Sequence, residues 1–97
     1  MAKYINISSA AHTTLRKKNI NGGNLTSLTI VNYDLSDSVT ATLYLDDNTN
    51  EYKIISVKMR PLTTLVLGKE DNIAYDSRVY DLKLHTDTTA SLTVTMK

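Results

Sequence analysis

The chain has 97 residues, which is enough for one domain and too few for two independent ones. Its hydrophobic fraction of 41% and charged fraction of 22% are those of a folded globular protein, and they argue against a disordered or membrane-spanning chain. The net charge of +1, with acidic and basic residues interspersed, gives no broad field that would attract nucleic acid or an anionic membrane. We therefore expect a single domain over residues 1–97, with neither nucleic acid nor a membrane as partner.

The residue types narrow the class further. There is no cysteine, so neither a disulfide framework nor a thiolate metal site is expected. The N-terminus, from Met1 to Tyr4, is strand-like and lacks the apolar stretch of a signal peptide, so export is not expected. All six aromatic residues are Tyr, a side chain that suits half-buried sheet faces and contact surfaces.

Alternation of apolar and polar residues predicts strands along the whole chain. It is clearest where Val39, Ala41, Leu43 and Leu45 alternate with polar or aromatic residues, which predicts a strand with one buried face. In chain order, the expected strands span residues 3–7, 12–17, 25–33, 39–45, 52–58, 62–67, 80–85 and 92–97. Pro61 lies at the head of the sixth, where its missing N–H breaks no central ladder.

Turn-forming residues separate these segments, at 21–23, 34–37, 46–50, 68–72 and 86–89. Turn signals every 8 to 12 residues, with no helical period between them, are typical of antiparallel sandwiches or barrels. The sequence therefore predicts an all-β fold, an antiparallel β-sandwich of about eight strands, either jelly-roll-like or immunoglobulin-like. Strand order depends on long-range pairing, which the local pattern does not encode.

The sequence offers no catalytic constellation, and we expect a protein that is not an enzyme. The only imidazoles are His12 and His85, and both fall on outward positions of the alternation. Asp87 follows His85 closely, but that spacing is equally that of two solvated side chains. No catalytic or cofactor-binding residue is assigned, and no cofactor is expected.

The segment from Asp46 to Glu51 imitates the start of a calcium loop, with oxygen-bearing side chains at Asp46, Asn48 and Asn50. The imitation ends there, because Glu51 stands where the loop needs glycine and Val57 where it needs a bidentate acid. Asp and Asn also accept turn conformations readily. We therefore expect a hairpin turn and no metal site.

Two sets of residues are candidates for contact with a partner. The N-terminal strand is apolar enough to dock on a neighbour, which makes Tyr4, Ile5 and Ile7 a candidate interface. A strand that pairs within its own domain is the alternative. The other set is a candidate ligand or contact hairpin, composed of Tyr44, Asp46, Asp47, Asn48 and Tyr52.

Five segments together resemble a family of small virion structural proteins of marine tailed bacteriophages. They are KYINI (3–7), LYLDD (43–47), PLTTLVL (61–67), VYDLKL (79–84) and LTV (92–94). The resemblance implies a non-catalytic capsid decoration or cement protein, or a head-tail component, assembled in the host cytoplasm and located in the virion. Its partners would be other copies of itself and a major capsid or tail protein, and no binding residue is carried over from the family.

A second function remains open on the residues alone. In a carbohydrate-binding sandwich, exposed Tyr rings stack on sugars while Asp and Asn hold hydroxyl groups. The hairpin around Tyr44 and Tyr52 has these residue types, as a tail or fibre module would need.

Overall fold

The computed structural model describes residues 3–20, 25–68 and 75–97, and this part of the chain contains eight strands and no helix. Each of the eight expected strands is present, which confirms the predicted all-β class. The strands are β1 (Lys3–Ile7), β2 (Ala11–Arg16), β3 (Leu28–Asn32), β4 (Val39–Asp46), β5 (Glu51–Met59), β6 (Thr63–Leu67), β7 (Asp81–Thr86) and β8 (Leu92–Met96). No helix that could cross a membrane occurs among the described residues.

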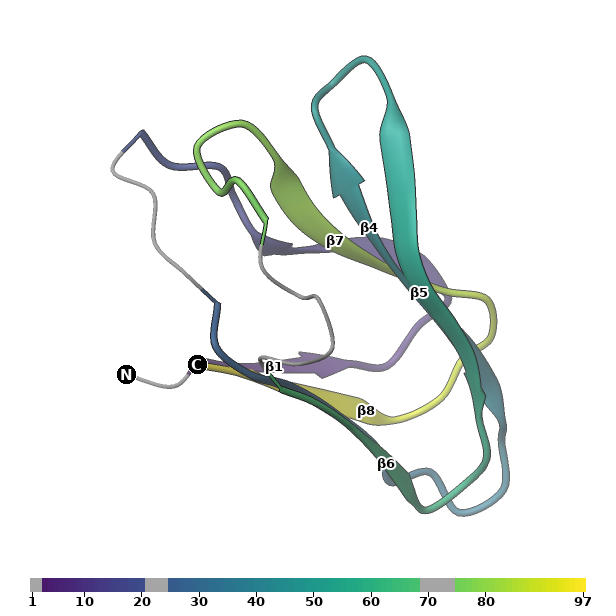
Figure 1. Ribbon diagram of the computed structural model, residues 1–97. Helices are drawn as coiled ribbons and strands as arrows, with labels where there is room; N and C mark the ends of the chain where they lie inside the picture. The colour runs from purple at the N-terminus through teal and green to yellow at the C-terminus, as the bar shows by residue number, and fades with distance from the viewer. Residues whose placement is uncertain (1–2, 21–24, 69–74) are drawn as a thin grey trace.

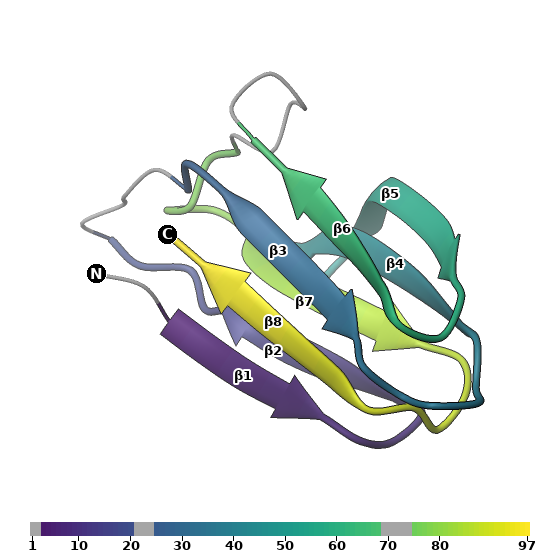
Figure 2. The ribbon, with the colours of Figure 1, turned by 90° about the horizontal axis from the view of Figure 1, so that it is seen from below.

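The strands form two antiparallel sheets that pack face to face (Figure 1). One sheet has the order β1-β8-β3-β6 and the other the order β2-β7-β4-β5, and Figure 2 shows the first sheet in front of the second. The first strand thus pairs with the last, the second with the seventh, the third with the sixth and the fourth with the fifth. This is a long hairpin rolled into two layers, the jelly-roll order, so the sandwich is not immunoglobulin-like.

The core lies between the two sheets and is built from alternate residues of each strand. In the first sheet, the inward row Ile5, Val94, Ile30 and Leu65 crosses all four strands. Val94 and Ile30, at its centre, are completely buried. Every second side chain along a strand therefore contributes to one continuous apolar layer.

The predicted buried face of β4 is confirmed. Val39, Ala41 and Leu43 are each at most 2% exposed, and Leu45 is half-buried against the same core. The opposite face of β4 is covered as well, because β4 is a central strand whose outward residues are flanked by side chains of β5 and β7. Tyr44 is consequently 3% exposed.

The strand ends differ from the expected ones by a few residues. β6 begins at Thr63 because Pro61 and Leu62 form the preceding turn, in which Leu62 has a φ of 61°. Proline followed by a residue with positive φ is the signature of a type II turn. The turns expected at 34–37, 46–50 and 86–89 do separate strands, whereas the one at 21–23 and residues 69–72 of another lie outside the described residues.

Candidate functional site

The candidate interface on the N-terminal strand divides between core and surface. β1 pairs with β8 within its own domain and forms one edge of its sheet. Ile7 is 5% exposed and Ile5 packs against the core, so both belong to the interior. Tyr4 points outward and is 70% exposed, which leaves it as the member of this set that a partner can reach.

The candidate contact hairpin places its two tyrosines on opposite faces. Tyr52 is the direct partner of Leu45, whereas Tyr44 precedes Leu45 and so points to the other side of β4. The ring of Tyr52 is half-exposed and meets the ring of Tyr80 edge-on, with centroids 5.9 Å apart. One flat ligand cannot stack on both Tyr44 and Tyr52.

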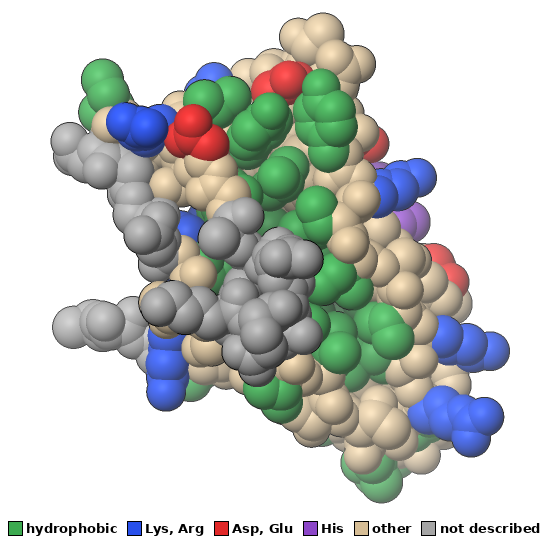
Figure 3. Space-filling model, in the orientation of Figure 1, with side chains coloured by type: hydrophobic (Ala, Val, Ile, Leu, Met, Phe, Trp, Pro, Cys, Tyr) green, Lys and Arg blue, Asp and Glu red, His purple; other side chains and the backbone are tan. Residues whose placement is uncertain are grey.

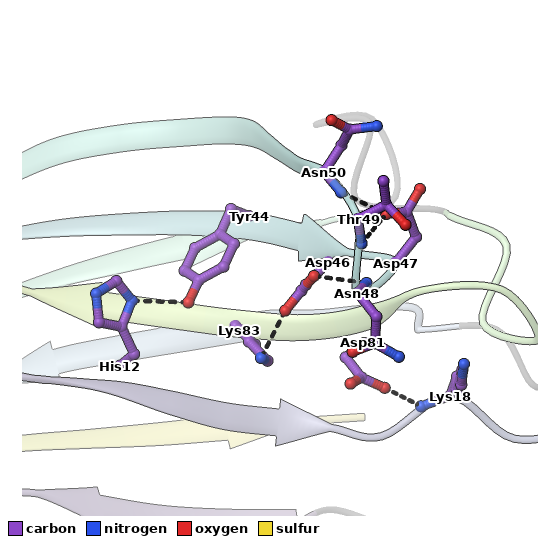
Figure 4. A network of polar contacts seen from close by, with 10 residues as sticks. All are labelled: His12, Lys18, Tyr44, Asp46, Asp47, Asn48, Thr49, Asn50, Asp81 and Lys83. Carbon is purple, nitrogen blue, oxygen red and sulfur yellow. Dashed lines mark hydrogen bonds and ion pairs between the residues drawn. The ribbon is translucent and has the colours of Figure 1, made fainter.

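The carboxylates of the β4–β5 turn are occupied by the turn itself (Figure 4). Asp47 accepts hydrogen bonds from the amides of Asn50 at 2.7 Å and Thr49 at 2.9 Å, and these bonds hold the pKa of Asp47 below its ordinary value. Asp46 accepts from the amide of Asn48, whose φ of 73° is one that asparagine tolerates in turns. The acidic cluster thus shapes the hairpin. Nowhere in the described ranges do three or more His, Asp or Glu side chains gather in a way that could hold a metal.

A polar network continues from this turn across the outer face of the β2-β7-β4-β5 sheet (Figure 4). Asp46 receives the ammonium of Lys83 at 2.7 Å, and this contact is the first cause of a lowered pKa at Asp46 and a raised pKa at Lys83. Asp81, on the same strand as Lys83, accepts from the amide of Lys18 at 2.6 Å. These contacts tie β4 to β7, and β7 to the segment that follows β2.

Both histidines lie on this outer face, as the alternation predicted. His12 and His85 are direct partners in the β2–β7 register, with ring centroids 4.3 Å apart. The hydroxyl of Tyr44 lies 2.7 Å from Nδ1 of His12, and burial is the main cause of a raised pKa at Tyr44. Asp87, the residue that could have oriented an imidazole, instead accepts from the amide of Thr40 at 2.8 Å. The cluster therefore joins β2, β7 and β4 through their side chains.

The outer face of the other sheet has a different chemistry. Its outward residues form two rows across all four strands, and we call these eight residues the uncharged face. The rows are Tyr4, Thr95, Thr29 and Val66, and Asn6, Thr93, Val31 and Thr64. None of them is charged at neutral pH, while the opposite outer face carries Lys53, Lys58, Lys83, Asp46, Asp81 and Glu51.

The edge strands of the two sheets also differ, in the regularity of their pairing. Both edge strands of the β2-β7-β4-β5 sheet contain a register shift, at Thr14/Arg16 in β2 and opposite Leu43/Tyr44 in β5. Bulges and lysines on an edge strand hinder pairing with another chain. The edge strands β1 and β6 of the first sheet keep a continuous register over all five of their residue pairs. The first sheet is therefore regular at both edges and uncharged on its outer face.

Local pattern did not disclose the uncharged face. The alternation of Thr with aliphatic residues predicts many outward threonines, but it could not show which strands are neighbours. The face is complete only because β1, β8, β3 and β6, distant in sequence, pair in that order. Models of known protein families give no match to the chain, and no curated protein sequence matches it either.

Proposed function

We propose that the protein is a non-catalytic structural component of a bacteriophage virion, a capsid decoration or cement protein that binds in many copies to the shell. The observation that carries this proposal is the uncharged face. In a chain of which 22% is charged, eight outward residues over four neighbouring strands carry no charge. The centres of protein interfaces are depleted of charged residues and enriched in tyrosine, and the exposed Tyr4 fits that composition.

Two further points support the proposal. The jelly-roll order recurs in viral capsid domains, although a fold alone never determines a function. The segments that resemble small phage virion proteins include both edge strands of the first sheet, KYINI (3–7) in β1 and PLTTLVL (61–67) around β6. The sheet that presents the uncharged face thus contains much of the sequence that resembles small phage virion proteins.

The test combines mass spectrometry of purified virions from the phage that encodes the chain with binding to particles stripped of the protein. Thr29→Glu with Thr95→Glu places charge at the centre of the uncharged face and should abolish binding to the particle. Both side chains are partly exposed, so the variant should fold. A matched control, Thr14→Glu in β2 with Thr49→Glu in the β4–β5 turn, adds the same charge at exposed positions elsewhere and should bind normally. Absence of the protein from virions, together with a strict monomer at high concentration, would contradict the proposal.

The alternative, a carbohydrate-binding module of a tail or fibre, has weaker support. Tyr44 is buried and Tyr52 faces the other way, so the hairpin does not present two stacking rings together. Among the described residues, the aromatic platform that remains on this end is the half-exposed ring of Tyr52 with the partly buried ring of Tyr80. A glycan array at high protein concentration distinguishes the two functions, and binding lost in Tyr52→Ala would favour the sugar-binding one.

A further inference from the structure

The two histidines of the chain lie side by side on neighbouring strands. His12 in β2 and His85 in β7 are direct partners in the antiparallel register, and their ring centroids are 4.3 Å apart. His12 is exposed and His85 is half-buried. Figure 3 shows histidine atoms at the molecular surface, next to Lys or Arg atoms and to Asp or Glu atoms. Both imidazoles of the protein are thus gathered at one place that solvent can reach.

Most of the ring nitrogens of this pair are not used by the fold. Nδ1 of His12 lies 2.7 Å from the hydroxyl of Tyr44, a contact drawn in Figure 4. Among the residues that the structure describes, no hydrogen bond reaches Nε2 of His12 or either nitrogen of His85. A histidine that binds a metal typically uses one nitrogen for the ion and fixes its ring through the other. The hydroxyl of Tyr44 provides such a second contact for His12.

The spacing of the two rings suits one shared ion. Side chains at directly opposite positions of antiparallel strands have Cβ atoms about 4.5 to 5.5 Å apart. Two nitrogens on one tetrahedral ion are about 3.3 Å apart, given metal–nitrogen bonds of about 2.0 to 2.1 Å. The rings stack with their planes 22° from parallel, so their nitrogens do not converge in that arrangement. Rotation about the Cβ–Cγ bond, which is only weakly restricted in histidine, turns them towards a common point without moving the backbone.

The charges around the pair do not oppose a cation. Lys83, the next outward residue of β7, has its ammonium 2.7 Å from the carboxylate of Asp46, which compensates its charge. Asp87 follows His85 by two residues, and a hydrogen bond from the amide of Thr40 holds the pKa of the Asp87 carboxyl below its ordinary value. Asp87 is therefore an anion at neutral pH, and its charge favours a cation at the neighbouring imidazoles.

We propose that His12 and His85 together bind one divalent transition-metal ion, through one nitrogen of each ring. Imidazole is a good ligand for Zn²⁺, Ni²⁺ and Cu²⁺, and Cu²⁺ should bind most tightly because its affinity for a given nitrogen site is the highest of the three. Ca²⁺ and Mg²⁺ prefer oxygen ligands and should not bind here. The protein supplies two ligands, one fewer than in catalytic zinc sites, so water completes the coordination and the ion is held reversibly.

A bound ion would link the edge strand β2 to β7 through side chains. The backbone pairing of these strands is interrupted by the register shift at Thr14/Arg16, so β2 is the place where a further link has most effect. An ion that binds the folded chain and not the unfolded one stabilises the fold. The site does not depend on the proposed virion function, because it lies on the outer face opposite the uncharged face.

Calorimetric titration with Cu²⁺ at about pH 7.5, where histidine is ordinarily neutral, tests the proposal. One ion should bind per chain. His12→Gln and His85→Gln should each weaken binding by about tenfold or more, because one of the two ligands is lost. Asp47→Asn removes a carboxylate of the β4–β5 turn and should leave the affinity unchanged. Circular dichroism should show that all three variants are folded.

Two further measurements distinguish a shared ion from loose association. Electron paramagnetic resonance of the Cu²⁺ complex should show nitrogen ligands, with fewer of them in either histidine variant. Zn²⁺ should raise the midpoint of thermal denaturation of the original protein and of Asp47→Asn, but not that of His12→Gln or His85→Gln.

Several results would overturn the proposal. They are no saturable binding of Cu²⁺ up to about 1 mM, or an unchanged affinity in either histidine variant. Two ions per chain would mean that each imidazole binds alone, and equal binding of Mg²⁺ would assign the site to carboxylates; both would overturn it too. The result for virion binding of the Thr29 and Thr95 variant is independent of all these outcomes.

Discussion

The imidazole rings of His12 and His85 stack on one another on the outer face of the β2-β7-β4-β5 sheet, with their planes 22° from parallel. Tyr44 completes the cluster from β4, with its ring edge-on to His12 at 84° and its hydroxyl 2.7 Å from Nδ1. β2 is an edge strand, whereas β4 is central. The cluster therefore attaches the edge of the sheet to its middle through side chains as well as through the backbone.

Removing the hydroxyl of Tyr44 should weaken this attachment. Tyr44→Phe is expected to lower the free energy of unfolding by about 1 kcal/mol, because a part-buried hydrogen bond is lost while the ring remains. Urea denaturation measures the change. Tyr33→Phe, at a ring that is 49% exposed, should cost less than about 0.5 kcal/mol. In a His12→Ala background, Tyr44→Phe should lower the free energy of unfolding by clearly less than it does in the original protein. An equal loss in both backgrounds would show that the hydroxyl of Tyr44 does not act through His12.

A charge at the centre of β4 should unfold the domain. Leu43→Asp places a carboxylate at a position 2% exposed, where an unpaired charge costs several kcal/mol. Circular dichroism should show loss of the β spectrum. Thr14→Asp, exposed and paired with Lys83, should remain folded.

The structure changes the expected effect on stability of substituting Thr42, the outward neighbour of Leu43. From the alternation alone Thr42 is a surface residue, and Thr42→Asp should be mild. In the folded protein Thr42 is 8% exposed, and its hydroxyl lies 3.0 Å from that of Ser56. We therefore expect Thr42→Asp to destabilise more than Thr14→Asp, and equal stability of these two variants would contradict that expectation.

Much of the fold could be predicted because apolar and polar residues alternate with a period of two along a strand. Val39, Ala41 and Leu43 show this period within the chain, and Leu92 and Val94 show it near the end; all five are buried. The period depends only on neighbouring residues, so one sequence suffices to read it. It also tells inward from outward, which is why the position of the core was predictable.

The surfaces could not be predicted in this way, because they are assembled from distant strands. The contact between His12 and His85 joins residues 73 positions apart, and the row from Tyr4 to Val66 crosses four strands. Burial of Tyr44 likewise depends on which strands flank β4. Pairing of this kind is decided by the whole packed domain and leaves no local signal.

The turn between β5 and β6 offers a test of backbone strain. Leu62 follows Pro61 and has a φ of 61°, a conformation that costs a residue with a Cβ about 1 to 2 kcal/mol. Its side chain is 67% exposed, so little packing is lost when it is removed. Leu62→Gly should therefore raise the free energy of unfolding by about 0.5 to 1 kcal/mol, seen as a higher midpoint in thermal denaturation.

A matched control separates strain from the loss of an exposed apolar side chain. Leu35 is 84% exposed, and φ is positive at no described residue other than glycine except Asn48 and Leu62. Leu35→Gly should therefore be neutral or destabilising, because glycine gains nothing there and adds freedom to the unfolded chain. The same rise in midpoint in both variants would mean that relief of the turn is not the cause.

Acid should weaken the fold through the aspartates that close its turns. The amides of Asp37 and Ser36 hold the pKa of Asp34 below its ordinary value of 3.8, and amide bonds do the same at Asp47. A folded-state pKa below that of the unfolded chain means that the unfolded state takes up protons first. The stabilisation is therefore complete above about pH 5 and is lost as the pH falls through the unfolded-state and then the folded-state pKa. The free energy of unfolding should drop between about pH 5 and about pH 2, and Asp47→Asn should make that drop smaller.

General repulsion among the cations at low pH would produce a drop too, but salt screens it, whereas carboxylate–amide bonds are local. A drop that disappears in high salt and is the same in Asp47→Asn would assign the acid sensitivity to net charge and not to the turns.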